Sequence, residues 1–164
     1  MKLYLVRHGL AGQHGDYADD NERPLTDEGK KKTTRVARRL AESGMKFEKI
    51  LSSPLVRARQ TAEILVAEKL GDSIEEFPPL APDGKVRDWL NWWRGSAYRG
   101  PENSIALVGH EPDLGYWAES LVWGESRGNL IVKKAGVIGI EVPDRENPIA
   151  HCELFLLIPP KWLL

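Results

Sequence analysis

Histidine and arginine residues follow three short apolar segments of this chain. Arg7 and His8 come directly after the first segment, and His110 follows a later one after a single glycine. Arg57 lies a few residues beyond a third segment. Guanidinium groups match phosphoryl oxygens in shape and charge, and an imidazole can act as nucleophile, acid or base near neutral pH. Taken singly, each residue has an ordinary structural explanation, but together they indicate chemistry on a phosphoryl group.

Strands and helices alternate along most of the chain, and this alternation decides where those side chains lie. Strands are expected at residues 2–6, 50–51, 104–108, 130–132, 136–142 and 153–158, and helices within 26–44, 53–71, 84–95 and 112–124. The pattern is typical of an α/β protein, a three-layer α/β/α sandwich with a mostly parallel central sheet. In such sheets ligands bind at the carboxyl ends of the strands, where the histidines and arginines fall.

Capping and loop signals refine this outline. Thr26 is expected to cap the first helix, and Ser53-Pro54 reads as an N-cap followed by proline at the first helical position. Three prolines between residues 78 and 82 indicate an extended connection. The loop from Pro143 to Pro148 is too short for a helical crossover, so the last two strands should form an antiparallel edge near the C-terminus.

Composition restricts the class of protein. The 164 residues include 23 basic and 24 acidic ones, a formal net charge of −1, which disfavours binding to nucleic acid through bulk charge. Cys152 is the single cysteine, so neither an internal disulfide nor a cysteine-built zinc site can form. No apolar run approaches the ~20 residues that span a membrane, and no signal peptide is visible. We therefore expect one cytoplasmic domain over residues 1–164, with no nucleic-acid or membrane partner.

Four motifs, met in a fixed order, carry a resemblance to a known family. They are Arg7-His8-Gly9 after an apolar strand, Pro24-Leu25-Thr26 with Gly29, the run SSPLVRARQTAE from Ser52 to Glu63, and Val108-Gly109-His110-Glu111-Pro112. In this order they resemble the histidine phosphatase superfamily, which also contains the phosphoglycerate mutases. The short chain and the residues around His110 are most similar to the SixA-type phosphohistidine phosphatases. The motifs end near residue 120, and the tail fits only loosely.

The resemblance implies a phosphoglycerate mutase-like fold and a metal-independent hydrolase without a cofactor. It assigns His8 as the nucleophile, which attacks phosphorus and forms a transient phosphohistidine that water then hydrolyses. A neutral imidazole suits this role because its lone pair is available near neutral pH. Arg7, Arg57 and His110 would bind the phosphoryl oxygens, with His110 either protonated or oriented to donate a hydrogen bond.

The general acid is less clearly marked in the sequence. Family members that act on phosphate esters need a carboxylic acid to protonate the departing alkoxide. Asp83, in a Pro-Asp-Gly turn, and Glu111, beside His110, are the candidates, although either could simply cap or solvate the start of a helix. A phosphoramidate needs less help, because its nitrogen leaving group is more readily protonated. The weak placement of an acid therefore favours phosphohistidine over sugar phosphates as substrate.

Chain length bears on the substrate as well. Larger family members insert residues that cover the pocket, whereas this chain leaves room for an open site that admits a histidine on a protein surface. We therefore expect a phosphorylated histidine-containing protein of a signalling or phosphotransfer system as the partner. The alternatives are a small-molecule phosphomonoesterase, with a small phosphorylated metabolite as substrate, and a non-catalytic module that binds a phosphorylated ligand.

Three further patterns have simpler explanations. Residues 124–128 match the G-x-S-x-G serine-hydrolase motif, with Asp144 and His151 downstream, but a helix precedes and a strand follows, so a loop is expected. The basic residues between 30 and 39 should occupy the solvent face of a helix, with an acidic partner as the alternative. Trp89 and Trp93 share a helical face with apolar neighbours and are expected in the core, although the tryptophan cluster could flank the site entrance.

Overall fold

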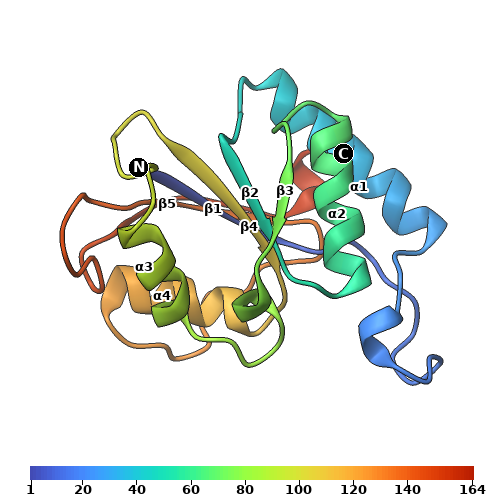
Figure 1. The fold of residues 1–164 in the computed structure, drawn as a ribbon. Coiled ribbons are helices and arrows are strands. Elements are labelled where there is room, and N and C mark those ends of the chain that lie inside the picture. Colours follow the sequence, from blue (N-terminus) through green and yellow to red (C-terminus); the bar gives the residue numbers. More distant parts are fainter.

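The computed structural model describes residues 1–164 and contains one six-stranded sheet with helices on both faces (Figure 1). The strands are β1 (Lys2–Arg7), β2 (Lys49–Ser52), β3 (Ile74–Glu76), β4 (Ser104–Gly109), β5 (Val137–Glu141) and β6 (Glu153–Ile158), in the order β3-β2-β4-β1-β5-β6. The helices are α1 (Asp27–Glu42), α2 (Val56–Ala67), α3 (Val86–Arg94) and α4 (Asp113–Trp123), and short 3-10 turns occupy Asp20–Glu22, Pro78–Leu80 and Pro160–Trp162.

The sheet is parallel from β3 to β1 and antiparallel beyond it. β1 and β2 both pair in parallel with β4, and β2 pairs in parallel with β3. β5 runs antiparallel to β1, and β6 runs antiparallel to β5. The predicted mostly parallel sheet with an antiparallel edge is therefore confirmed.

Alternating side chains of the strands serve two separate cores, one on each face of the sheet. Leu3 and Leu5 of β1 pack in the cluster that contains the buried residues of α3 and α4. Tyr4 and Val6 pack in the other cluster, with the buried residues of α1 and α2. Figure 1 shows the same division, with α1 and α2 on one side of the strands and α3 and α4 on the other. This arrangement is the α/β/α sandwich expected from the alternation of elements.

Local capping explains where α1 begins and where α4 ends. The Thr26 hydroxyl accepts a hydrogen bond from the Gly29 N–H at 2.9 Å, which confirms Thr26 as the cap of α1. Gly124 takes a left-handed conformation (φ +88°) immediately after α4, as a C-terminal glycine commonly does.

The predicted N-cap at Ser53 is wrong, because α2 begins three residues later at Val56. The backbone N–H of Ser53 instead donates to the carbonyl of Val108 at 2.9 Å, which extends the β2–β4 pairing by one residue. The Ser53 hydroxyl accepts from the N–H of Leu55 at 3.2 Å within the following turn. This placement puts the Ser53 side chain at the sheet edge rather than at a helix start.

Two strand predictions also differ from the structure. Residues 130–132 form no strand, because side chains take their backbone groups: Leu130 donates to Glu119, and the Val132 carbonyl accepts from Arg7. The short edge strand β3 falls between the expected helix and the proline-rich connection, where no strand is predicted. It contains two acidic residues and one apolar residue, a composition with no strand signal of its own.

The tryptophan cluster is largely core. Trp89 and Trp93 are fully buried and stacked, with ring centroids 5.8 Å apart, as the helical spacing predicted. Trp92 is partly buried and stacks on Tyr98. The basic residues of α1 all lie on its exposed face, and residues 124–128 form a loop, so both of those expectations are confirmed.

Truncation of Trp93 to alanine should lower the free energy of unfolding by about 3–5 kcal/mol, because it empties a buried site and removes a stacked ring. Urea denaturation followed by circular dichroism would measure the change. Trp123→Ala is the matched control, since Trp123 is 55% exposed and its loss should change stability by less than about 0.5 kcal/mol. Equal losses in the two variants would contradict the assignment of Trp93 to the core.

No helix combines the length and the apolar composition that a bilayer crossing requires.

Candidate active site

The carboxyl ends of β1, β2 and β4 lie in register at one edge of the sheet. Arg7 pairs with Gly109, and Ser52 pairs with Val108. The next residues along each strand are therefore neighbours, which places His8, Ser53 and His110 side by side. The histidine ring centroids are 5.2 Å apart, with the planes inclined at 54°.

His8 is held in one orientation by the backbone that follows it. The ring is 5% exposed, and its Nδ1 lies 2.7 Å from the Gly9 carbonyl oxygen. A carbonyl can only accept, so Nδ1 carries the proton and the lone pair of the neutral ring is on Nε2. Gly9 itself is packed tightly: its N–H donates to Thr61 Oγ1, and a Cβ there would lie 2.2 Å from Thr33 Oγ1. Close packing of a glycine against α1 and α2 thus fixes the imidazole.

His110 occupies the first position after β4 and is 3% exposed. Its Nε2 lies 2.7 Å from the hydroxyl oxygen of Ser53. Its Nδ1 is buried and has no hydrogen-bond partner within the protein.

Arg57 lies in the first turn of α2, close enough to His8 and His110 for its charge to act on both. Its side chain is 5% exposed, and its two terminal nitrogens donate to Asp20, one to the backbone carbonyl at 2.8 Å and one to the carboxylate at 3.2 Å. Arg23 donates to the same carboxylate at 2.8 Å. Asp20 therefore anchors the loop after β1 over the guanidinium of Arg57.

Arg7, the last residue of β1, is held by the segment that follows α4. One terminal nitrogen donates to the Val132 carbonyl at 3.0 Å. The N–H of Ala135 donates to the carbonyl oxygens of both Arg7 and His8, so the segment that follows α4 closes this side. Glu111 lies close enough for its charge to act on Arg7.

Three of the five buried side-chain polar atoms without a partner belong to these residues. They are Arg7 Nε, Arg57 Nε and His110 Nδ1. Buried donors are almost always paired in folded proteins, because an unpaired one costs about 1–3 kcal/mol. Three such nitrogens, on residues whose charges or rings act on His8, are an arrangement that an oxyanion would satisfy.

The site holds both imidazoles in the neutral form. Burial lowers the pKa of His8 to about 3, opposed by its hydrogen bond to Gly9 and aided by the charges of Arg57 and Arg7. Burial likewise lowers the pKa of His110 to about 3, aided by the same two arginines. In the ligand-free protein, burial and the two arginines therefore favour the neutral form of His110 at neutral pH.

These lowered pKa values make stability depend on pH in a definite direction. Between pH 6.5 and pH 3 the unfolded chain binds a proton at each of these histidines and the folded protein does not, so stability rises with pH and falls as pH is lowered. The slope below pH 6.5 should approach about 1.4 kcal/mol per pH unit for each imidazole. Urea midpoints between pH 7 and pH 5 would measure it.

A His8→Gln variant should show about half of that slope over the same range, because one of the two buried imidazoles is gone. His14→Gln is the control, since the His14 side chain is 83% exposed and its replacement should leave the slope unchanged. An unchanged slope in both variants would contradict the assignment.

The two candidate acids are placed very differently. Asp83 is exposed, its backbone N–H donates to the Asp113 carboxylate at 2.8 Å, and its own carboxylate makes no hydrogen bond or ion pair within the protein. Glu111 accepts from the N–H of Gly115 at 2.9 Å, and burial raises its pKa against the opposing effects of that hydrogen bond and of Arg7. Of the two carboxylates, only Glu111 interacts with a residue of the site, through the charge of Arg7.

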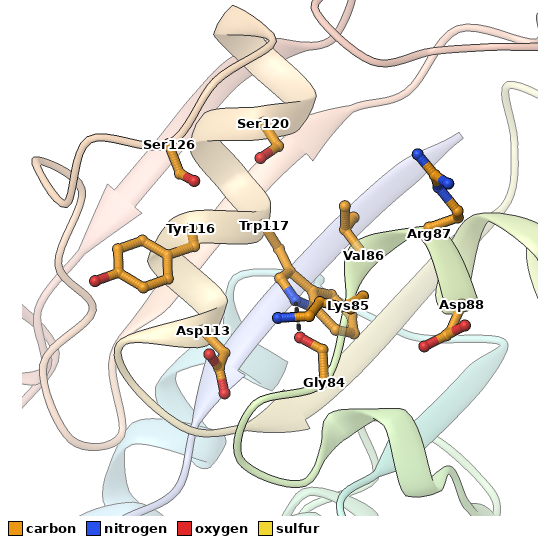
Figure 2. Close-up of a pocket in the computed structure, with 10 residues that line it drawn as sticks. All are labelled: Gly84, Lys85, Val86, Arg87, Asp88, Asp113, Tyr116, Trp117, Ser120 and Ser126. Atoms are coloured by element: carbon orange, nitrogen blue, oxygen red, sulfur yellow. Dashed lines mark hydrogen bonds between the residues drawn. The ribbon is translucent and has the colours of Figure 1, made fainter.

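A neighbouring cavity of about 450 Å³ lies between the start of α3 and the exposed face of α4 (Figure 2). Asp113, Tyr116 and Trp117 line it from α4, and Lys85 faces them from the segment before α3. His8 and Arg57 do not line it. It is therefore a separate hollow, although one of its lining residues, Asp113, follows His110 by three positions in the sequence.

Two residues of the site were not identified from the sequence. The sequence indicates a helix cap at Ser53 and assigns no role to Asp20. The SSP run contains Ser53, so the sequence did carry a signal for it, whereas Asp20 is one of several similar acids between Gly9 and Arg23. Sequence spacing does not distinguish the one that meets Arg57.

Comparison with known proteins agrees with the fold and the motifs. Residues 3–81 match the sequence model of the histidine phosphatase superfamily (branch 1). Phosphohistidine phosphatase SixA of Escherichia coli (strain K12) is 32% identical over 127 residues, which cover 77% of each chain. An uncharacterized protein of Picosynechococcus sp. is 48% identical over 168 residues, covering 100% of this chain and 99% of the relative. The solved structure of the protein histidine phosphatase SixA complexed with tungstate covers both chains fully, with a TM-score of 0.86 and 26% identity.

The chain therefore belongs to the histidine phosphatase superfamily. Within it the protein is SixA-like in sequence and fold, and it is a phosphatase of the hydrolase class.

Proposed function

We propose that this protein is a phosphohistidine phosphatase that removes phosphate from a histidine of another protein, through a phosphoenzyme intermediate on His8. The observation that carries the proposal is the set of buried nitrogens without a partner, Arg7 Nε, Arg57 Nε and His110 Nδ1, on residues that act on an imidazole with a free Nε2 lone pair. If these nitrogens bind the oxygens of a phosphoryl group, the Nε2 lone pair of His8 can attack its phosphorus. The tungstate bound to SixA is such an oxyanion and supports this assignment.

The chemistry takes two displacements at phosphorus. In the first, the His8 Nε2 lone pair forms a bond to phosphorus while the bond from phosphorus to the leaving nitrogen breaks, and that nitrogen keeps the electron pair and takes a proton from solvent. In the second, water attacks phosphorus, the bond to Nε2 breaks, and inorganic phosphate leaves. The arginines and His110 stabilise the charge on the oxygens in both steps.

The likeness to SixA over most of the chain supports a phosphorylated histidine as substrate, and with it a partner in signalling or phosphotransfer. A nitrogen leaving group also relaxes the demand for a strong acid. In this assignment His8, Arg7, Arg57 and His110 are the catalytic and phosphate-binding residues, residues 1–164 act as one domain, and no metal or cofactor takes part.

Incubation of the purified protein with a phosphohistidine-containing phosphotransfer protein and with a panel of phosphate esters tests the proposal. We expect release of phosphate from the phosphohistidine protein at a kcat/KM well above that for any ester. Turnover of esters alone would overturn the substrate assignment, and full activity of His8→Ala would overturn the mechanism.

A small-molecule phosphomonoesterase on the same site is the second candidate, and the position of Glu111 favours it. A half-buried carboxyl with a raised pKa beside Arg7 is suited to protonating an alkoxide leaving group. The ester panel distinguishes the two candidates directly.

The two carboxyl candidates lead to a prediction. Glu111→Gln should slow hydrolysis of alkyl phosphates by about 10²-fold, the usual effect of a general acid, and slow phosphohistidine hydrolysis far less. Asp83→Asn should leave both rates within about twofold, because its carboxylate is exposed and has no partner in the site. Steady-state kinetics on both substrates would measure this. A selective loss of ester hydrolysis in Asp83→Asn would reverse the assignment.

A further inference from the structure

Ser53 occupies a position for which the proposed mechanism has so far given no role. The residue is fully buried between the ends of β2 and β4. Its hydroxyl oxygen lies 2.7 Å from His110 Nε2 and 3.2 Å from the backbone nitrogen of Leu55. The Ser53 hydroxyl has no other hydrogen-bond partner within the protein.

These contacts decide which of the two groups donates. The Leu55 N–H donates to the Ser53 oxygen and occupies one of its lone pairs. If His110 Nε2 carried a proton, the Ser53 hydroxyl hydrogen and the lone pair of the buried Nδ1 would both be without a partner. If the hydroxyl donates to Nε2 instead, the Leu55 N–H, the Ser53 hydroxyl and Nε2 are all paired, and only the Nδ1–H of His110 is left without a partner in the protein. Nε2 of His110 is then the acceptor, and the proton of the neutral ring sits on Nδ1.

His8 and His110 are then the same tautomer, but they leave different ring nitrogens free for a ligand. His8 donates from Nδ1 to Gly9 and presents an unprotonated Nε2. His110 accepts at Nε2 from Ser53 and presents a protonated Nδ1, which is buried and has no partner in the protein. One ring therefore offers a lone pair and the other offers a donor.

We propose that Ser53 is a positioning residue that fixes the Nδ1–H tautomer of His110, so that a neutral His110 donates a hydrogen bond to a phosphoryl oxygen. The proposal rests on the function proposed above, and it selects the second of the two states expected for His110, oriented rather than protonated. Burial of both rings, which disfavours their charged forms, supports it.

Nitrogen-15 NMR of the histidine side chains in the ligand-free protein at pH 7 tests the proposal directly. In the wild type we expect His110 Nε2 to show the chemical shift of an unprotonated nitrogen and Nδ1 that of a protonated one. Ser53→Ala should move the ring toward the Nε2–H tautomer and weaken binding of inorganic phosphate about tenfold, the value of one hydrogen bond to a charged group. Ser53→Thr, which keeps the hydroxyl, should restore both the tautomer and the phosphate affinity.

Ser52→Ala is the matched control. Ser52 is equally buried, but its hydroxyl donates to the Ser53 carbonyl and does not contact His110. It should leave the tautomer and phosphate binding unchanged. A wild-type His110 with its proton on Nε2 would overturn the proposal without any variant. An unchanged tautomer and phosphate affinity in Ser53→Ala would do the same.

These measurements separate the present proposal from the proposed function. The tautomer is read without substrate, and phosphate binding is read without turnover. A protein that shows the Nδ1–H tautomer but no activity on phosphohistidine would contradict the proposed function alone.

Discussion

Replacement of His8 by alanine is expected to lower kcat by about 10⁴-fold or more, because removal of the proposed covalent nucleophile eliminates the route through the phosphoenzyme. The fold should survive, since the surrounding backbone is held by the pairing of β1 with β4 and β5. Steady-state release of phosphate from a phosphohistidine protein would measure the loss. Trapping with a radiolabelled substrate, quenched in alkali to preserve phosphohistidine, should label the wild type and leave the variant unlabelled.

His14→Ala serves as the control, because the exposed His14 side chain lies in the loop after β1 rather than at its end. It should keep the wild-type rate and the wild-type label. Label incorporation into His8→Ala at the wild-type rate would assign the nucleophile to another residue.

Arg57→Ala should have the second largest effect, a fall in kcat/KM of about 10²- to 10³-fold. The variant loses a buried positive charge from the site and the anchor of the loop that carries Asp20. Arg57→Lys should recover only part of the activity, because an ammonium lacks the planar set of donors of a guanidinium. Kinetics on one phosphohistidine substrate, with KM and kcat separated, would compare the variants.

Two variants separate the charge of Arg57 from its role as a loop anchor. Arg23→Ala removes the other guanidinium that binds Asp20, and Asp20→Ala frees both arginines. If Arg57 acts on the phosphoryl group, both should lower kcat/KM by less than about tenfold. If either matched the loss in Arg57→Ala, the loop would be the cause and the phosphate-binding role would be wrong.

Much of the fold could be predicted from the sequence, because its signals are local. Strand β1 is an apolar run, Thr26 is a helix cap, and Gly124 ends a helix, and each of these signals is visible within a few residues. The placement of polar side chains at strand ends then indicated which edge of the sheet carries the site. That edge follows from the direction of parallel strands and needs no knowledge of side-chain contacts.

Features that depend on distant contacts could not be predicted in this way. Residues 130–132 have the composition of a strand, yet Glu119 and Arg7 take up their backbone groups. The partner of Arg57 is a residue 37 positions earlier, and the partner of His110 is 57 positions earlier. Tertiary contacts of this kind override local preference, and they decide the protonation state of the site as well.

The order of the strands also fixes when the site can come into being. β4 follows β1 and β2 in the chain but lies between them in the sheet, and β1 pairs only with β4 and β5. Before residue 104 has been added, a growing chain can pair β2 with β3 but has no strand to place beside β1. Pairings so distant in sequence form slowly, because the loop must close before the contacts repay its entropy. His8 and both arginines are thus synthesised long before they can meet His110, and insertion of β4 between β1 and β2 is the step that assembles the site.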